Sequence, residues 1–107
     1  MLVVLFRSKL VDAPDGYAEM AQEMLELAKT TPGFIDIKAF TADDGERLTV
    51  VWWQDEDTLR GWRTNARHLV AQKAGRERWY AYFKLEVAEV KRSKDFVRPS
   101  VEPAHLG

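Results

Sequence analysis

The sequence has 107 residues and contains no cysteine. This absence excludes a disulfide framework, a thiolate nucleophile and a zinc site with thiolate ligands. Histidine is scarce as well, because only His68 and His105 are present, and a metal site normally needs three or four convergent ligands. The P-loop, dinucleotide-binding, HExxH and GxSxG signatures are also missing. We therefore predict that the chain uses no metal and no cofactor.

Acidic and basic residues are nearly balanced, and no apolar run is long enough to cross a membrane. Sixteen basic and seventeen acidic residues give a net charge of −1, without the basic stripe that a nucleic-acid backbone requires. The opening run MLVVLF is too short for a membrane span or a signal peptide and leads straight into Arg7. We expect no nucleic-acid partner, no membrane partner and a cytoplasmic location, which the lack of cysteine fits.

What the sequence does contain is the composition of one soluble globular domain, with 46% hydrophobic and 31% charged residues. Two-residue alternation predicts strands at residues 2–10, 34–41 and 47–53, and a last strand that reaches about Arg92. Three-and-four spacing of apolar residues predicts a helix over roughly residues 14–30, which Pro32-Gly33 ends. A second helix starts with the acidic residues 55–57 and bends or stops near Ala74-Gly75. Its apolar stripe is Leu59, Trp62, Ala66, Leu69 and Val70.

The order β-α-β-β-α-β predicts an α+β, ferredoxin-like domain with an antiparallel four-stranded sheet and both helices on one face. Strand 47–53 is apolar on both faces, since Leu48, Val50 and Trp52 alternate with Thr49, Val51 and Trp53. The face without helices therefore needs a cover, and a second copy packing sheet to sheet is the simplest one. We predict a homodimer that forms a dimeric α+β barrel.

The domain is expected to span residues 1–96, followed by an extended tail at residues 97–107. This tail carries Pro99 and Pro103 and has no periodicity. Two interpretations stay open: a loose end with a solvated His105, or an arm that crosses to the partner.

Candidate site residues gather between Val51 and Tyr82, which hold all four tryptophans. On a regular helix Asn65, His68 and Gln72 share one face. That face lies opposite the apolar stripe and would be solvated, unless a break between Trp62 and His68, to which Gly61 would contribute, turns it inward. Each tryptophan is a candidate for the core.

Arg76 and Arg78 beside Trp79 suggest two readings, a solvated charged turn or a clamp for an anion or phenolate.

Two stretches resemble the antibiotic biosynthesis monooxygenase superfamily of dimeric α+β barrels. The first stretch, Trp53-Gln-Asp-Glu-Asp, is similar to the W-x-S/D-x-E motif of this superfamily, which joins the third strand to the second helix. The second stretch is similar to the pattern of one subgroup: it is His68-Leu-Val-Ala-Gln72-x-x-Gly75-Arg76-x-x-Trp79-Tyr80, followed by Leu85-x-Val87-Ala88. The resemblance covers about residues 1–96. Its members include cofactor-free oxygenases of phenols and quinols, haem-degrading enzymes, isomerases and proteins without an established activity.

Carried over residue by residue, the resemblance is incomplete. Trp53 matches the tryptophan near the substrate of the phenol oxygenases, whereas Thr49 and Leu59 replace their Asn and Tyr. Trp62 matches the tryptophan of the haem-degrading members, whereas Gln72 stands at the position of their histidine. An amide is a poor axial ligand for haem iron.

The resemblance and the residues together predict a cofactor-independent monooxygenase that acts on a small electron-rich aromatic, a phenol or quinol. We expect Trp53, Trp62, Asn65 and Gln72 to bind the substrate, His68 to act as the base and Arg76 to bind the anion. The alternative is a non-enzymatic dimer that binds a small hydrophobic ligand or serves as a structural module. A haem-binding or haem-degrading protein is a further alternative. The discriminating observation is whether His68 faces a cavity or bulk water.

Overall fold

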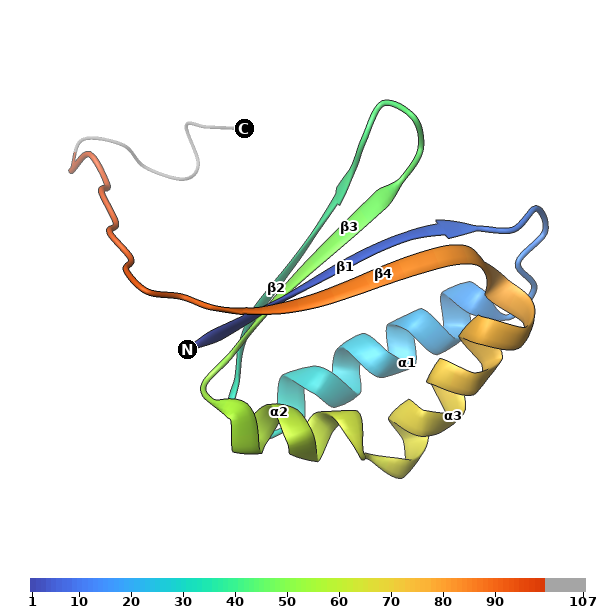
Figure 1. The fold of residues 1–107 in the computed structure, drawn as a ribbon, viewed down its shortest axis with the longest axis horizontal. Helices are drawn as coiled ribbons and strands as arrows, with labels where there is room; N and C mark the ends of the chain where they lie inside the picture. Colours follow the sequence, from blue (N-terminus) through green and yellow to red (C-terminus); the bar gives the residue numbers. More distant parts are fainter. Residues whose placement is uncertain (100–107) are drawn as a thin grey trace.

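A four-stranded antiparallel sheet, with its helices on one face, organises the chain (Figure 1). The computed structural model describes residues 1–99, so His105 and most of the predicted tail lie outside the described residues. In sequence order the elements are β1 (Leu2–Leu10), α1 (Tyr17–Thr30), β2 (Phe34–Thr41), β3 (Arg47–Trp53), α2 (Glu56–Arg63), α3 (Ala66–Ala74), the π-helical turn η1 (Gly75–Trp79) and β4 (Tyr80–Glu89).

The strand order is β2-β3-β1-β4, which confirms the predicted α+β, ferredoxin-like fold. Val4 at the centre of β1 is paired with Val51 of β3 and with Val87 of β4. Because residues two apart on a strand point to the same face, this register puts Val4 and Phe6 on one face and Val3 and Leu5 on the other. The first set lies against the helices.

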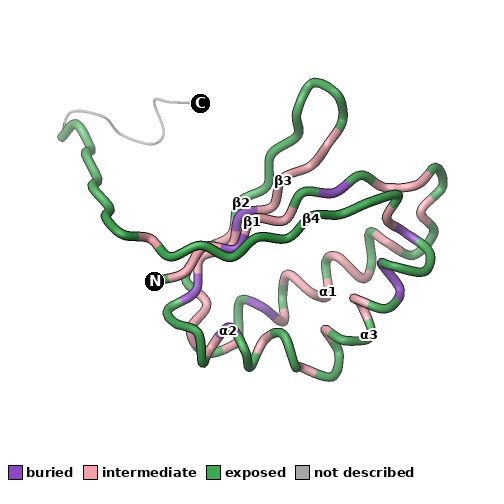
Figure 2. Tube along the Cα trace, in the orientation of Figure 1, coloured by how far each residue is buried: buried purple, intermediate pink, exposed green. Residues whose placement is uncertain are grey.

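The hydrophobic core lies where β3 meets α2. Trp53 is 1% exposed, and it clusters with Val4 of β1 and Leu59 of α2. The ring of Phe34 meets Trp53 edge to face at 5.8 Å between centroids. Figure 2 shows that β4, in contrast, is exposed from its second residue to its end. The core is therefore concentrated at one end of the sheet, and the space under β4 is less filled.

The second helix is broken, and this corrects the prediction of one continuous apolar stripe. α2 ends at Arg63, and α3 begins at Ala66 after Asn65, whose Oδ1 accepts from the backbone N–H groups of Arg67 and His68. Such capping satisfies free N–H groups at the start of a new helix. Leu69 and Val70 are consequently 48% and 49% exposed and not part of the core.

Gly61 is not where the helix breaks. It lies inside α2, in open space. The break falls at Thr64 and Asn65, and its local cause is the capping side chain of Asn65.

Of two other predicted boundaries, one shifts and one agrees with the structure. α1 begins at Tyr17 and not near Pro14, because Gly16 has a φ of 84°, a left-handed conformation that a helix cannot contain. At its far end α3 stops at Ala74, which confirms the predicted end, and the chain continues as η1, which buries Trp79. The Trp79 indole N–H donates to Asp15 O at 2.8 Å, which joins η1 to the loop before α1.

The sheet face without helices is apolar at one end and charged at the other. Val50 is buried there, and its neighbours Leu5 and Trp52 are partly exposed. At the other end, Arg7 donates to both carboxylate oxygens of Glu46 at 2.6 and 3.3 Å, and the Tyr82 hydroxyl donates to Glu46 at 2.6 Å. The Arg7 guanidinium, with help from Tyr82, lowers the pKa of Glu46.

After Glu89 the described part of the chain contains no further helix or strand, and it leads away from the sheet (Figure 1). Phe96 and Val97 are 77% and 76% exposed. Within residues 1–99, no helix is both long and apolar enough to cross a membrane.

Candidate functional site

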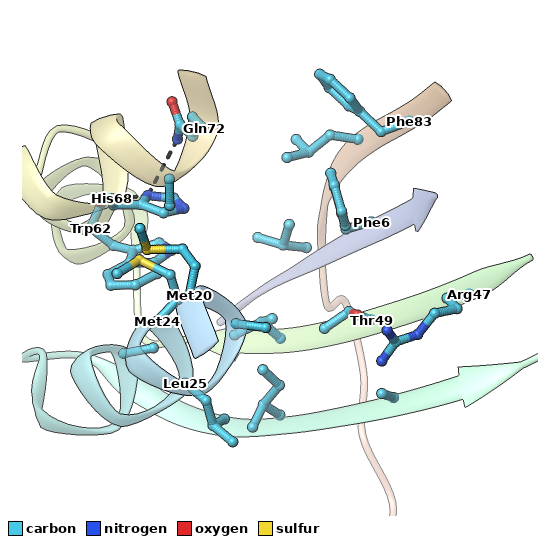
Figure 3. Close-up of a pocket in the computed structure, with 18 of the residues that line it drawn as sticks. Phe6, Met20, Met24, Leu25, Arg47, Thr49, Trp62, His68, Gln72 and Phe83 are labelled. Atoms are coloured by element: carbon cyan, nitrogen blue, oxygen red, sulfur yellow. Dashed lines mark hydrogen bonds between the residues drawn. The ribbon is translucent and has the colours of Figure 1, made fainter. Parts of the chain in front are cut away.

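A cavity of about 930 Å³ lies between the sheet and the helices. Residues of all four strands line it on one side, and residues of α1, α2, α3 and η1 line it on the other. The middle of the cavity is apolar, with Met20 and Met24 of α1 facing Phe6 of β1 and Leu85 of β4. Figure 3 shows that Trp62, His68 and Gln72 lie together at one end and Arg47 lies at the other.

His68 lines this cavity because the break between α2 and α3 turns its side of α3 inward. The imidazole stacks on the Trp62 ring, with centroids 4.1 Å apart and an interplanar angle of 21°. The Trp62 ring in turn stacks near Trp53 at 5.9 Å. The three rings fix the position of His68 at the buried end of the cavity.

The hydrogen bonds of His68 define its tautomer. Its Nδ1 lies 3.1 Å from the backbone oxygen of Trp62 and 3.3 Å from Nε2 of Gln72. A carbonyl oxygen can only accept, so the shorter contact places the proton on Nδ1 and leaves a lone pair on Nε2. In this tautomer Gln72 cannot donate to Nδ1, so the Gln72 amide is a neighbour that completes the packing.

Burial lowers the pKa of His68, and the hydrogen bond to Trp62 O opposes this only in part. A charged imidazolium loses more hydration on burial than the neutral ring does. His68 is therefore neutral at pH 7, with Nε2 as a basic nitrogen. This is the protonation state that a general base needs.

The structure brings five of the six predicted site residues to one cavity. Trp53, Trp62, His68, Gln72 and Arg76 line it, whereas Asn65 does not. The side-chain oxygen of Asn65 caps α3 at 2.9 Å from Arg67 N and 3.2 Å from His68 N. We therefore assign Asn65 a role in positioning α3. Arg76 is exposed, and within residues 1–99 no carboxylate pairs with it.

Among the polar residues of the cavity that sequence reasoning missed, Arg47 and Tyr80 are half-buried. Arg47 is half-buried at the start of β3, on the same side as Thr49. Tyr80 is half-buried at the start of β4 and packs against Phe6 at 5.4 Å between ring centroids. Burial, followed by the neighbouring Tyr17, raises the pKa of Tyr80, so its hydroxyl remains protonated and can donate. The two-residue alternation of β3 was the available signal for Arg47.

Metal-binding geometry is not found in the described part of the chain. No group of three His, Cys, Asp or Glu side chains within residues 1–99 converges in a way that can hold a metal ion.

Comparison with known proteins identifies the family. Residues 1–74 match the family model described as antibiotic biosynthesis monooxygenase. The uncharacterized protein YqjZ of Bacillus subtilis is 34% identical over 93 residues, which cover 87% of this chain and 82% of that protein. The chain therefore belongs to the antibiotic biosynthesis monooxygenase family.

A second relative is the jasmonate monooxygenase ABM of Pyricularia oryzae, which is 29% identical over 96 residues. The match covers 87% of this chain but 45% of that protein, so the chain spans less than half of the length of this relative.

Solved structures share the fold at low identity. SnoaB, a cofactor-independent oxygenase from Streptomyces nogalater, superposes with a TM-score of 0.72 at 15% identity, over 86% of this chain and 94% of SnoaB. Rv0793 from Mycobacterium tuberculosis gives a TM-score of 0.76 at 14% identity, over 88% and 98% of the two chains.

Proposed function

We propose that the protein is a cofactor-independent monooxygenase that acts on a small electron-rich aromatic, a phenol or quinol. The observation that carries this proposal is the neutral His68, whose stacked ring lines a largely apolar cavity. The family, and the relatives whose names describe a monooxygenase and a cofactor-independent oxygenase, support the same reaction class.

The reaction follows from the properties of such a substrate. His68 Nε2 accepts the proton of the substrate hydroxyl, and the resulting anion is electron-rich enough to reduce oxygen directly. One oxygen atom bonds to a ring carbon, and the other leaves as water with two hydrogens from the substrate. The substrate therefore supplies all the electrons, and the protein contributes a base, orientation and exclusion of water.

The tryptophans have different parts in this proposal. One face of Trp62 is covered by the His68 ring, so Trp62 mainly holds the imidazole in place. Trp53 is 1% exposed, and its ring packs against the Trp62 ring and supports it. Arg76 lies on the rim of the cavity and supplies positive charge for the substrate anion.

Oxygen uptake with a panel of phenols and quinols tests the proposal. We expect uptake by the wild-type protein and at least a 100-fold loss in His68→Ala, the lower end of the usual contribution of a positioned base. Leu69→Ala is the matched control, because Leu69 is on the exposed side of the same helix turn. No uptake across a broad panel, or equal rates in both variants, would contradict the proposal.

The alternative of a non-enzymatic ligand-binding dimer is favoured by the apolar middle of the cavity, which a ligand can fill without reacting. It predicts saturable binding of small aromatics without oxygen uptake. Hemin titration addresses the further alternative: a one-to-one Soret shift that disappears in His68→Ala, followed by bleaching with a reductant in air, would favour haem chemistry.

We also propose that the protein is a homodimer, joined through the sheet face without helices. The apolar end of that face, around Val50, Leu5 and Trp52, is of the kind that interfaces cover. Leu48→Glu places a charge on this face and should shift the sedimentation of the protein toward the monomer. A wild-type protein that sediments as a monomer at micromolar concentration would rule out this interface.

A further inference from the structure

The cavity is lined by basic residues and by no acidic ones, although acidic residues outnumber basic ones in the chain by 17 to 16. Five basic residues line it: Lys29, Lys38, Arg47, Arg63 and Arg76. No Asp or Glu contributes to its surface. A concave apolar site with one sign of charge concentrates ligands of the opposite sign. The composition of the cavity therefore favours an anionic ligand.

Arg47 is different from the other four basic residues. Lys29, Lys38, Arg63 and Arg76 are exposed, whereas Arg47 is half-buried. No carboxylate within residues 1–99 forms an ion pair with Arg47. Its neighbour Glu46 points to the opposite face of the sheet, where it binds Arg7. A guanidinium that has lost part of its water without gaining a carboxylate partner is suited to bind an anion.

The surroundings of Arg47 add hydroxyl donors. Figure 3 shows the Arg47 side chain running back along β3 toward Thr49, which also lines the cavity. Tyr80 lies at the same end of the sheet, because Arg47 of β3 is paired with Ser8 of β1 and Tyr80 of β4 is paired with Leu10 of β1. Arg47, Thr49 and Tyr80 thus present a fixed positive charge and two hydroxyl groups at one end of the cavity.

This end lies far from His68. Trp53, which supports the Trp62–His68 stack, is on the same strand as Arg47 but six residues away. At about 3.3 Å per residue, this separation corresponds to roughly 20 Å along β3. The wall between the two ends is apolar and includes Val4, Met24 and Val51. A small phenol fills only one end of this cavity.

We propose that the ligand is an elongated amphipathic acid, whose carboxylate is bound by Arg47 with Thr49 and Tyr80 and whose oxidisable ring lies against His68 and Trp62. This inference deepens the proposed function by making the phenol or quinol ring one end of a longer acid, and it rests on that function for the position of the reacting ring. The proposed carboxylate site concerns binding alone, so it can be tested whether or not the protein consumes oxygen.

The experiment compares 6-(2-naphthyl)hexanoic acid with its methyl ester by isothermal titration calorimetry at pH 7.5. The two probes share the ring and the chain, and only the acid carries a charge. We expect the wild-type protein to bind the acid at least about 10-fold more tightly than the ester, the usual gain from a charge-assisted hydrogen bond. Arg47→Gln should remove this preference and leave the affinity for the ester unchanged.

Arg63→Gln is the matched control, since Arg63 is a second arginine on the same cavity but is exposed and has no part in the proposed site. It should keep the preference for the acid. Tyr80→Phe, which retains the ring, should reduce the preference by a smaller factor than Arg47→Gln does. The unchanged affinity for the ester verifies that each variant is folded with an intact cavity, and Arg47→Lys, which keeps the charge, provides a second variant.

Three results would overturn the proposal: equal binding of acid and ester by the wild-type protein, a preference that survives in Arg47→Gln, or a preference that disappears in Arg63→Gln instead. A failure of the proposed monooxygenase function would give a different result from a failure of the carboxylate site. In that case no oxygen is consumed, while the preference for the acid and its dependence on Arg47 persist.

Discussion

Two glycines in the α2–α3 region offer a matched test of how tightly the cavity wall is packed. Gly75 has helical backbone angles, with φ −59° and ψ −48°, so alanine causes no backbone strain there. A Cβ at this position would lie 2.6 Å from Cε2 of Tyr80 and 2.9 Å from Cδ2. The Tyr80 ring is itself packed against Phe6 and Tyr17. At Gly61, in contrast, a Cβ meets nothing within 4 Å.

Gly61→Ala and Gly75→Ala both gain helix stability, but only Gly75→Ala creates a steric clash. Replacing glycine by alanine within a helix stabilises it by about 1 kcal/mol. Gly61→Ala should therefore raise the free energy of unfolding by about 1 kcal/mol. Gly75→Ala has the same gain but adds an overpacking cost of about 1–3 kcal/mol. The free energies of unfolding of the two variants should consequently differ by about 1–3 kcal/mol, with Gly75→Ala the less stable.

Urea unfolding followed by tryptophan fluorescence measures this difference, with all proteins at the same concentration because the proposed dimer would unfold in a concentration-dependent way. Tyr80→Ser removes the ring that causes the clash, so in that background Gly75→Ala should stabilise like Gly61→Ala. If Gly75→Ala is as stable as Gly61→Ala in the presence of Tyr80, the Tyr80 ring does not lie as close to Gly75 as the structure shows.

Two further predictions concern α3. Asn65→Ala removes the cap of this helix and should lower the free energy of unfolding by about 0.5–2 kcal/mol, whereas Asn65→Asp should retain most of it; an unchanged urea midpoint in Asn65→Ala would contradict the capping role. Because burial lowers the pKa of folded His68, the unfolded chain takes up the proton first as the pH falls through about 6.5, so stability declines below that pH. His68→Gln should lose less stability than the wild type between pH 7.5 and 5. Three carboxyl groups with lowered pKa values also make stability depend on pH, but they do so at lower pH; these are Glu23, Glu46 and Asp55. Parallel urea midpoints for the two proteins would refute this assignment.

The sheet could be predicted from the sequence because its signals are local. The strands at 2–10, 34–41 and 47–53 lie at the predicted residues, since alternation and turn residues define them without help from the rest of the chain. The strand pairing followed from the order of the elements. The family, predicted from the stretches around Trp53 and His68, is also confirmed.

The environment of His68 could not be predicted in the same way. The segment Arg63-Thr64-Asn65-Ala66 has no proline or glycine, so its propensity permits a continuous helix. What decides the break is one side chain that caps the next helix, and this competes with helix continuation by a small free energy. The close approach of Gly75 to Tyr80 likewise depends on where η1 meets β4, which no local pattern encodes.

The break after α2 also determines the protonation chemistry of the histidine. In an uninterrupted helix, Trp62 O would accept the backbone N–H of Ala66 four residues later. Here the chain turns at Thr64, and the same oxygen accepts from Asn65 N at 3.2 Å and contacts His68 Nδ1 at 3.1 Å. A main-chain carbonyl, and not an acidic side chain, therefore orients the imidazole. Because this carbonyl carries no formal charge, it can fix which nitrogen bears the proton without stabilising the imidazolium as strongly as a carboxylate would. A relative that restores a continuous helix at these positions would lose the orienting group even if it kept the histidine.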